Sequence, residues 1–405
     1  MQVTFFVDKY PCYSETFIQS QIDGLALAGV QVNIITLFSD TDLPETANIK
    51  VNAIYTHRQG KFITLLQRCW SVMLGLRLKS VQRSLWQQKF RLLRSGLFLP
   101  ALASQWQRKF NRIDTDIILA HFGTTGVTAA MLIELGLLKG KLVTVFHGFE
   151  LSEHSILKRY SAAYRALFSL SALCMPVSQL WAERLLALGC SADKIKVHHM
   201  GIYPDSFTML EPTRPLHKPL RLLSVARLVE KKGLDDAIAA IALLTQSGHA
   251  ATLKIVGDGP LKTALDRQIA EQELNDCVEL TGALAHQQVR QMLQDCDIFL
   301  LPSKTASNGD MEGIPVSLME AMARGLIVIS THHSGIAELI RHAHSGFLAQ
   351  ERSPEQLAAL IKNVATETDI VQIRLNARQR VEADFNQSLL NQQLLTTLRH
   401  LHETA

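Results

Sequence analysis

The sequence has little of what marks membrane proteins, disulfide-rich proteins and disordered chains. Its longest apolar stretch, residues 126–138, is interrupted by Glu134 and falls short of the roughly 18 residues that cross a bilayer. The six cysteines stand singly, with no paired spacing for a zinc site or a disulfide framework. Charged residues make up only 19% of the chain and hydrophobic residues 47%, which is typical of globular proteins. We therefore expect a globular protein with reduced, mostly buried thiols.

The amino-terminal sequence lacks the features of a secretory signal. The hydrophobic run within residues 1–9 is too short, no basic residues precede it, and no small-residue cleavage site follows it. We expect the chain to stay in the cytoplasm. Its 405 residues correspond to two or three domains.

Acidic residues are missing from residues 57–112, which contain twelve Lys and Arg residues. The rest of the chain has 29 basic and 37 acidic residues, so the net charge of +4 hides two regions of opposite sign. Trp70, Trp86 and Trp106 lie in this basic aromatic segment. Apolar residues at helical spacing in 61–79, flanked by cations, predict an interfacial helix on anionic lipid. A core-packed helix with a solvated basic rim is the alternative, and nucleic acid is disfavoured because no nucleic-acid-binding fold signature accompanies the charge.

Short β-rich apolar runs alternate with helical patterns along the whole chain. The expected strands form two series, at 3–7, 32–37, 116–120, 141–146 and 196–198, and at 221–226, 252–256, 277–280, 297–301 and 326–330. Such alternation predicts doubly wound α/β domains with parallel sheets. A proline-rich stretch between the series predicts a linker. We expect an amino-terminal domain over 1–203, a linker over 204–219, a carboxy-terminal domain over 220–385 and a final helix over 386–405 that can return to the first domain.

Polar and glycine residues follow the expected strands, at the edge where open parallel sheets bind ligands. Ser14, Glu15 and Thr16 follow the first strand, and His121 and His147 follow two neighbouring strands. A histidine at a strand end can hydrogen-bond a sugar hydroxyl or a phosphate oxygen, and it can equally be a packing residue. We expect the two sheets to face each other across a cleft.

Cations and glycines follow the strands of the second series. Arg227 and Lys232 lie on one short loop, where two cations can grip a diphosphate through charge-assisted hydrogen bonds; a solvated turn is the alternative. Gly257 and Gly259 follow the next strand, but the third glycine of a dinucleotide-binding fingerprint is missing, which argues against a nicotinamide cofactor. These glycines either let the backbone approach a nucleotide or form a plain tight turn. Ser303 follows the fourth strand of this series.

The strongest local signal lies in residues 308–322. Pro315 suits the first turn of a helix, which puts Glu312 in the loop before it and Glu320 about one and a half turns inside. Free backbone amides at this helix start can bind phosphate with help from the helix dipole. The two carboxylates then bracket an anion site and can accept hydrogen bonds from a ribose or a hexose. On its own, a helix with two glutamates is more often structural.

Two Asp-x-Asp sequences match a short pattern that binds divalent metal in some sugar transferases. Asp40 and Asp42 lie in a polar loop, and Asp114 and Asp116 precede an expected strand at its amino edge. We assign both pairs to turns and capping, and we expect no metal.

Taken together, these residues resemble the retaining glycosyltransferases of family 4, which have the GT-B architecture of two facing Rossmann-like doubly wound α/β domains with a central cleft. The resemblance runs over nearly the whole chain. The motifs that carry it are Ser14-Glu-Thr-Phe17, His121-Phe-Gly123, His147-Gly148, Arg227, Lys232-Gly233, Gly257-Asp-Gly-Pro260, Pro302-Ser303, Glu312, Glu320, Ser334-Gly-Ile-Ala-Glu338 and Gly346-Phe-Leu348. The exopolysaccharide subgroup, as in colanic acid biosynthesis, is the most similar.

The resemblance implies roles for these residues. Arg227 and Lys232 would bind the donor diphosphate, and Glu320 the nucleotide ribose. Glu312 would bind hydroxyls of the transferred sugar, and His147 would lie at the reacting centre. The remaining expected contacts are Gly257, Gly259, Ser303, Gly313, Ile314 and Pro315 for the donor, and Ser14, Glu15, Thr16 and His121 for the acceptor. In the family's front-face route the leaving phosphate takes the proton of the acceptor, so no protein base is expected. Arg227, Lys232 and the helix start before Glu320 would stabilise the charge on the leaving oxygen, so no metal is expected.

We therefore expect a retaining hexosyltransferase that uses a nucleotide sugar, with a UDP-hexose favoured. Its acceptor would be a polyprenyl-diphosphate-linked saccharide in bacterial exopolysaccharide, capsule or lipopolysaccharide O-antigen biosynthesis. The basic aromatic segment would hold the protein against the inner face of the cytoplasmic membrane as a peripheral protein. A nucleotide-sugar epimerase of GT-B architecture and a catalytically silent binding protein are the alternatives. No cofactor and no nucleic-acid partner are expected.

Overall fold

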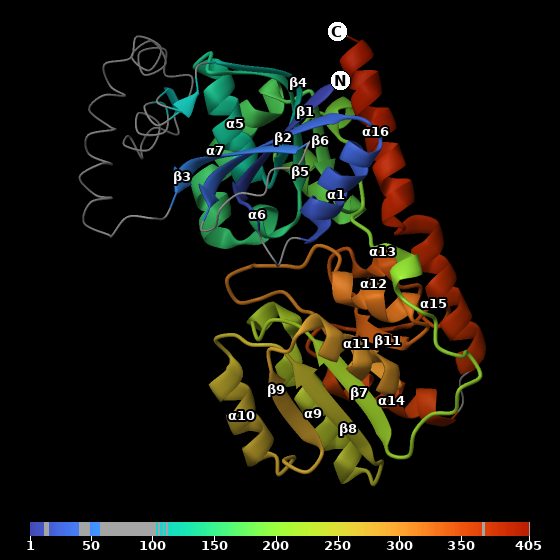
Figure 1. Cartoon of the computed structure of the whole chain (residues 1–405). Coiled ribbons are helices and arrows are strands. Elements are labelled where there is room, and N and C mark those ends of the chain that lie inside the picture. The colour runs from blue at the N-terminus through green and yellow to red at the C-terminus, as the bar shows by residue number, and fades with distance from the viewer. Residues whose placement is uncertain are drawn as a thin grey trace. The chain divides into compact units, whose positions relative to one another are not determined.

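A computed structural model of the chain describes residues 1–11, 16–39, 49–56, 103, 106–107, 109–110, 112–366 and 369–404 (Figure 1). The chain divides into two compact units. The first comprises Met1–His198 and Ser388–Ala405, and the second comprises His199–Gln387. Each unit is built on one six-stranded sheet, and all strand pairs described in both sheets are parallel.

The sheet of the first unit has the strand order β3-β2-β1-β4-β5-β6. Its strands are β1 (Gln2–Lys9), β2 (Gln31–Ser39), β3 (Ile49–Thr56), β4 (Ile113–His121), β5 (Leu138–Phe146) and β6 (Leu173–Pro176). The helices among its described residues are α1 (Thr16–Leu27), α5 (Gly123–Glu134), α6 (Phe149–Ser152), α7 (His154–Leu170), α8 (Gln179–Ala187) and α16 (Gln387–Glu403). This strand order is that of a doubly wound nucleotide-binding fold, whose direction of winding switches here between β1 and β4. Loops at the carboxyl ends of β1 and β4 are therefore the expected place for ligands.

The carboxy-terminal helix α16 packs against the first unit, beside α1 (Figure 1). Asn391 Nδ2 donates a hydrogen bond to the carbonyl of Ser20 in α1 at 3.1 Å. A Cβ atom on Gly24 would lie only 1.9 Å from the same Nδ2 atom, so the two helices touch at this glycine. Sequence segments from both ends of the chain thus build one unit.

The second unit repeats the topology, with the strand order β12-β11-β10-β7-β8-β9. Its strands are β7 (Leu220–Val225), β8 (Ala251–Val256), β9 (Val278–Gly282), β10 (Ile298–Leu300), β11 (Ile327–Thr331) and β12 (Phe347–Ala349). Its α-helices are α9 (Leu234–Gln246), α10 (Lys262–Glu271), α11 (His286–Asp295), α12 (Val316–Ala323), α13 (Ile336–Leu339), α14 (Pro354–Thr366) and α15 (Ile370–Asp384).

Both faces of this second sheet are buried under helices. Leu222 and Ile298 face one side, where they join residues of α9, α10 and α14 in one apolar cluster. Their chain neighbours Leu223 and Phe299 face the other side and join residues of α11, α12 and α15. Because successive strand residues point to opposite faces, a strand buried on both sides must be apolar at nearly every position. This explains why the expected strands read as continuous apolar runs.

Three strands of the structure were not predicted, namely β3, β6 and β12. The sequence of β6 is only four residues long and ends in a proline, and β12 has three residues, so neither carries a strong local signal. The expected strand at 196–198 is wrong. Only an isolated bridge joins Ile195 to Cys174, and the Lys196 N–H donates to the Cys174 carbonyl at 3.1 Å.

Residues 204–219, which we expected to form a linker, are anchored to the second unit. Arg374 of α15 donates from Nη1 to the carbonyls of Pro212 and Arg214 at 2.8 and 2.6 Å. Arg378, one turn further on, binds two more carbonyls of the same stretch. The proline-rich segment therefore packs against α15 and forms part of the second unit.

None of the helices in the described ranges is long and apolar enough to cross a membrane. Four cysteines fall within those ranges, and all four are free thiols. Cys174, Cys190 and Cys296 are buried and Cys277 is half-buried, which agrees with the expectation of mostly buried thiols.

Candidate functional site

The carboxyl edge of the second sheet gathers the residues predicted for the donor. Arg227 follows β7, Gly257 and Gly259 follow β8, and Ser303 follows β10; residues 312–315 lie on the same long loop as Ser303, just before α12. Because β7 pairs in parallel with both β8 and β10, their carboxyl ends share one edge. The strand topology thus brings to one edge residues that lie up to about 90 positions apart in the sequence.

Lys232 and Glu312 form an ion pair at this edge. Lys232 ends the short 3₁₀ helix η4 (Glu230–Lys232), and its Nζ atom lies 2.9 Å from Oε1 of Glu312. Glu312 is only 7% exposed. Burial by itself would raise the pKa of Glu312, but the ammonium groups of Lys232 and Lys231 outweigh burial and hold this pKa below its usual range. The carboxylate is therefore charged and can accept hydrogen bonds.

The start of α12 offers backbone donors beside this ion pair. Pro315 is the N-cap residue and makes no side-chain cap. Among the described residues, no acceptor is found for the N–H groups of Gly313, Ile314, Val316 and Ser317. Unpaired amides at a helix start, together with the positive end of the helix dipole, favour an anion.

Two glycines let the loops of this edge approach each other closely. Gly233 has a φ of +62°, and a Cβ atom there would lie 1.9 Å from the Pro302 carbonyl oxygen. Gly257 has a φ of +146°, and its Cβ atom would lie 1.8 Å from the Ala226 carbonyl oxygen. Both positions need glycine for contacts within the protein itself. The structure thus gives Gly257 a role in packing two loops together.

Glu320 lies inside α12, in a different environment from Glu312. Burial raises the pKa of Glu320 to about 7, although the guanidinium groups of Arg290 and Arg324 act in the opposite direction. Glu320 therefore changes its charge near neutral pH, whereas Glu312 stays ionised. The two glutamates of the motif are chemically distinct.

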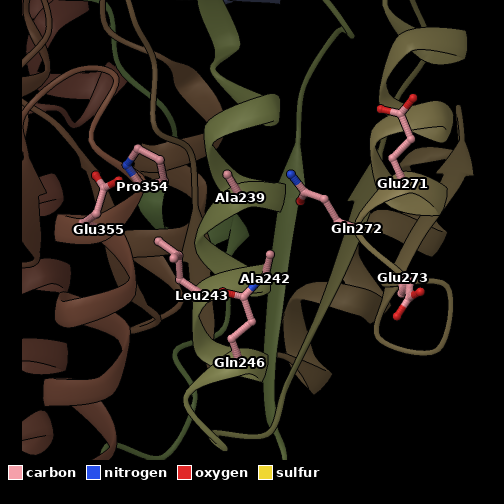
Figure 2. Close-up of a pocket in the computed structure, with 9 residues that line it drawn as sticks. All are labelled: Ala239, Ala242, Leu243, Gln246, Glu271, Gln272, Glu273, Pro354 and Glu355. Carbon is pink, nitrogen blue, oxygen red and sulfur yellow. The ribbon is translucent and has the colours of Figure 1, made fainter.

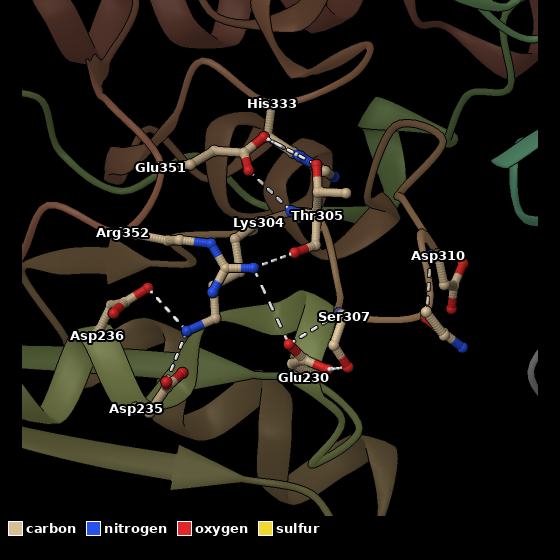
Figure 3. A network of polar contacts seen from close by, with 11 residues as sticks. Glu230, Asp235, Asp236, Lys304, Thr305, Ser307, Asp310, His333, Glu351 and Arg352 are labelled. Carbon is tan, nitrogen blue, oxygen red and sulfur yellow. Dashed lines mark hydrogen bonds and ion pairs between the residues drawn. The ribbon is translucent and has the colours of Figure 1, made fainter. Parts of the chain in front are cut away.

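A polar network ties together the loops of this edge (Figure 3). Lys304 is 2% exposed, and its Nζ atom contacts the carboxylates of Asp235 and Asp236, in the first turn of α9, at 2.6 and 3.0 Å. Glu230 accepts hydrogen bonds from the N–H and the hydroxyl of Ser307 at 2.9 and 2.7 Å. The loop after β10 is thereby fixed to the loop that carries Lys232.

His333 and Glu351 form the other part of this network (Figure 3). His333 follows β11 and is completely buried. Its Nδ1 atom lies 2.5 Å from Oε1 of Glu351, and its Nε2 atom accepts the backbone N–H of Glu312 at 3.1 Å. Neither residue was predicted from the sequence. His333 comes soon after the expected strand at 326–330, so its place after a strand was a signal that could have identified it.

In the first unit, His121 and His147 meet at the carboxyl edge of β4 and β5. His121 Nδ1 lies 3.1 Å from His147 Nε2, and the two rings stack with centroids 5.3 Å apart. Burial lowers the pKa of His121 to about 3 and the pKa of His147 well below its usual value, so both rings are neutral. One nitrogen of this contact therefore carries the hydrogen and the other accepts it. His121 has no exposed surface.

Glu150 holds the loop that carries His147. Its buried carboxylate accepts the backbone N–H groups of His147 at 2.8 Å, Gly148 at 3.0 Å and Gly123 at 3.4 Å. Burial raises the pKa of Glu150, and these N–H groups oppose the increase. The carboxylate joins the loop after β5 to the start of α5, which fixes the backbone at His147.

Other predicted residues of the first unit are only partly described. Ser14 and Glu15 lie outside the described residues, and Thr16 opens α1. The ring of Phe17, from the same motif, lies 4.8 Å from the ring of His147 between centroids. The start of α1 thus comes close to the two histidines.

The structure describes only one of the two Asp-x-Asp sequences. Asp40 and Asp42 lie outside the described residues. Asp114 and Asp116 lie within β4 rather than before it, because this strand begins earlier than expected. Asp116 Oδ2 accepts the N–H of Gln2 at 2.7 Å, which is a structural role. In the part of the chain that the structure describes, no three or more potential metal ligands come together.

Most of the basic aromatic segment, residues 57–112, lies outside the described residues. Trp106, near its end, is completely buried and packs on Phe110 with ring centroids 5.1 Å apart. Lys109 Nζ donates to the carbonyl of Ala53 in β3 at 2.8 Å. At Trp106, therefore, the segment belongs to the core and does not face a membrane.

A groove of about 460 Å³ lies elsewhere in the second unit, between α9, the end of α10 and the start of α14 (Figure 2). Glu271, Glu273 and Glu355 line it together with apolar and amide side chains. It contains none of the residues predicted for the donor. Its acidic lining disfavours a negatively charged ligand.

Comparison with known proteins gives consistent matches over the whole chain. Residues 14–206 match the family described as Glycosyltransferase Family 4, and residues 208–381 match Glycosyl transferases group 1. The chain is 42% identical to an amylovoran biosynthesis glycosyltransferase from Erwinia amylovora, over 99% of this chain and 100% of the relative. It is 39% identical to a proposed colanic acid biosynthesis glycosyltransferase from Escherichia coli K12, over 99% and 100%.

Solved structures share the fold. The HepE protein of Anabaena, in complex with UDP-glucose, has a TM-score of 0.70 at 20% identity, with 99% of this chain and 100% of that chain covered. A sucrose-phosphate synthase from Thermosynechococcus elongatus has a TM-score of 0.72 at 15% identity, with 100% of both chains covered. These likenesses and the family matches confirm the predicted α/β fold class of GT-B type.

Proposed function

The chain belongs to glycosyltransferase family 4, and we propose that it is a retaining hexosyltransferase that moves a hexose from a UDP-hexose to a lipid-linked saccharide. The names of two relatives that cover nearly the full chain support a place in exopolysaccharide biosynthesis. The complexes of the Anabaena neighbour with UDP and UDP-glucose support a nucleotide-sugar donor.

The observation that carries the proposal is the Lys232–Glu312 ion pair beside the open start of α12. A nucleoside diphosphate sugar is an anion at its diphosphate and a set of hydroxyl donors at its sugar. Lys232, the exposed Arg227 and the free amides on either side of Pro315 suit the diphosphate. The ionised carboxylate of Glu312 suits the sugar hydroxyls. Glu320, four residues into the helix, suits the ribose.

The same groups suit the chemical step. When the bond between the sugar and the diphosphate breaks, negative charge develops on the departing phosphate oxygen. Lys232, Arg227 and the helix-start amides would stabilise that charge, which makes a metal ion unnecessary in this proposal. Fixed donors of this kind each contribute about 10²–10³ in rate. The acceptor hydroxyl would attack from the face that the diphosphate leaves and pass its proton to the departing oxygen, so the sugar keeps its anomeric configuration.

His147 would hydrogen-bond a sugar oxygen at the reacting centre. Its Nε2 atom is already in contact with His121, so the Nδ1 atom of the neutral ring is the one left for the sugar, and Glu150 fixes the backbone that carries it. Because the ring is neutral, it would position the sugar rather than neutralise the diphosphate.

The test combines donor binding with transfer. Purified protein is screened by thermal shift against UDP-, GDP- and dTDP-hexoses, where a ligand at about 100 times its dissociation constant adds nearly 3 kcal/mol of stability. The stabilising sugar is then incubated with polyprenyl-diphosphate-linked saccharide, with and without a chelator, and the anomeric configuration of the product is read by NMR. We expect transfer with retention that survives the chelator and is lost in Glu312→Ala, while the exposed-residue control Glu355→Gln stays active.

Two experimental results would refute the proposal and support one of the alternative functions. Isomerisation of the nucleotide sugar without an acceptor would make the protein an epimerase. Undiminished polysaccharide formation in cells that carry only the Glu312→Ala variant would make it a catalytically silent binding protein.

We also propose that residues 57–112 attach the protein to the inner face of the cytoplasmic membrane. The support is their twelve cations without an acidic residue. Flotation with anionic liposomes measures the attachment, and neutral liposomes are the control. If reversal of four of these cations leaves both lipid binding and transfer to the lipid-linked acceptor unchanged, the attachment proposal fails.

A further inference from the structure

Three loops at the carboxyl edge of the second sheet meet at one buried histidine (Figure 3). His333 comes from the loop after β11, and its Nδ1 atom contacts Glu351 from the loop after β12 at 2.5 Å. Glu351 Oε2 in turn accepts the N–H of Thr305, in the loop after β10, at 2.8 Å. The other ring nitrogen of His333 reaches Glu312, further along that same loop, at 3.1 Å.

The chemistry of the groups around His333 decides which atom donates and which accepts in each of these hydrogen bonds. A backbone N–H can only donate, so the Nε2 atom of His333 must accept from Glu312 and carry no hydrogen. The hydrogen of the neutral ring therefore lies on Nδ1, where the Glu351 carboxylate accepts it. The N–H groups of Thr305 and His333 hold the pKa of Glu351 below its usual range against the effect of burial, so the carboxylate is present as an acceptor. Glu351 thus selects the tautomer that His333 needs.

Glu312 is consequently held at three points. Its N–H donates to His333, its carbonyl accepts the hydroxyl of Ser334 at 2.5 Å, and its carboxylate pairs with Lys232. Ser334 adopts the left-handed conformation with a φ of +48°, which the neighbouring contacts maintain. The position of the Glu312 carboxylate is therefore set by the backbone as much as by its ion pair.

We propose that His333 and Glu351 are positioning residues, which hold the backbone of Glu312 so that its carboxylate meets the transferred sugar. This inference rests on the proposed function of Glu312. His333 does not itself contact a substrate, because it has no exposed surface and both ring nitrogens are occupied within the protein. Its contribution is geometric, and a displacement of about 1 Å at a reacting group can cost about 100-fold in rate.

The test uses two amides that each replace one ring nitrogen. In His333→Gln the side-chain oxygen takes the place of Nε2 and can still accept the Glu312 N–H. In His333→Asn the amide takes the place of Nδ1, which keeps a donor for Glu351 and loses the contact with Glu312. We expect His333→Asn to lower kcat for transfer from the UDP-hexose by about 100-fold. We expect His333→Gln to retain most of the turnover, and Glu351→Gln to lie between them.

Binding of UDP separates positioning from loss of structure. UDP lacks the transferred hexose that Glu312 would contact, so its Kd, measured by calorimetry, should change far less in these variants than kcat does. His332→Gln, an exposed neighbour on the same loop, is the matched control and should change neither quantity. Equal kcat for His333→Asn and wild type, or loss of UDP binding in step with kcat, overturns the inference. A wild-type protein that neither binds UDP nor transfers a hexose overturns the proposed function instead.

Discussion

The pKa of Glu320 predicts how the stability of the protein depends on pH. Burial raises this pKa from its usual 4.5 to about 7, and the cations of Arg290 and Arg324 only partly offset burial. A shift of about 2.5 pKa units corresponds to roughly 3 kcal/mol at most. Because the folded state binds this proton more tightly than the unfolded state does, the contribution is fully present below pH 4.5 and is lost as the pH rises through 7.

Glu320→Gln removes this titration while it keeps the size of the side chain. We expect the free energy of unfolding of the wild type to fall relative to the variant by at most roughly 3 kcal/mol between pH 4 and pH 8, with little further change above pH 8. Urea unfolding followed by circular dichroism measures both proteins at each pH, and Glu355→Gln, an exposed glutamate, serves as the control. If the curves of wild type and Glu320→Gln remain parallel over this range, burial does not raise the pKa of Glu320.

Ligand binding gives a second, independent measurement of the protonation of Glu320. If Glu320 binds the ribose as a carboxylate, UDP-glucose, whose phosphates do not titrate near neutral pH, should bind more tightly as the pH rises through 7, and binding near pH 6 should release a proton. Calorimetry in two buffers of different ionisation enthalpy measures that release. Binding that is independent of pH would contradict the assignment of Glu320 to the ribose.

Three further outcomes follow from buried contacts. Lys232→Met leaves the buried carboxylate of Glu312 without its partner, so we expect about 3–5 kcal/mol lower stability in urea unfolding, and an unchanged midpoint would contradict the ion pair. His121→Phe replaces the imidazole by a phenyl ring and removes the hydrogen bond to His147, so we expect about 1–3 kcal/mol lower stability in urea unfolding, and an unchanged midpoint would contradict this contact. Gly233→Ala puts a Cβ atom 1.9 Å from a backbone oxygen of the neighbouring loop, so we expect a loss of more than about 1 kcal/mol, and a neutral result would refute the close approach.

Local sequence patterns predicted most of the fold and that the candidate donor residues share one edge of the second sheet. The apolar runs identified strands because a parallel sheet covered on both faces needs them, and the loop with Glu312 before the helix with Glu320 followed from Pro315. The carboxyl-edge rule placed Arg227 and Lys232 at the same edge as that loop, because neighbouring parallel strands end at the same edge, and Lys232 contacts Glu312 there. Each of these inferences depends on residues within a few positions of one another or on a rule of topology.

The tertiary structure decided what depends on the environment of a side chain. Glu312 and Glu320 have the same side chain, and nothing in the sequence gives them different pKa values. Their surroundings in the folded protein keep Glu312 ionised and raise the pKa of Glu320 to about 7. His333 meets Glu351 18 residues away, and Lys304 meets Asp235 69 residues away, through loops whose paths have no periodic signal. Helical spacing and strand alternation report on neighbours along the chain. Burial, tautomers and contacts between distant loops arise only when the packed chain excludes water and brings those groups together.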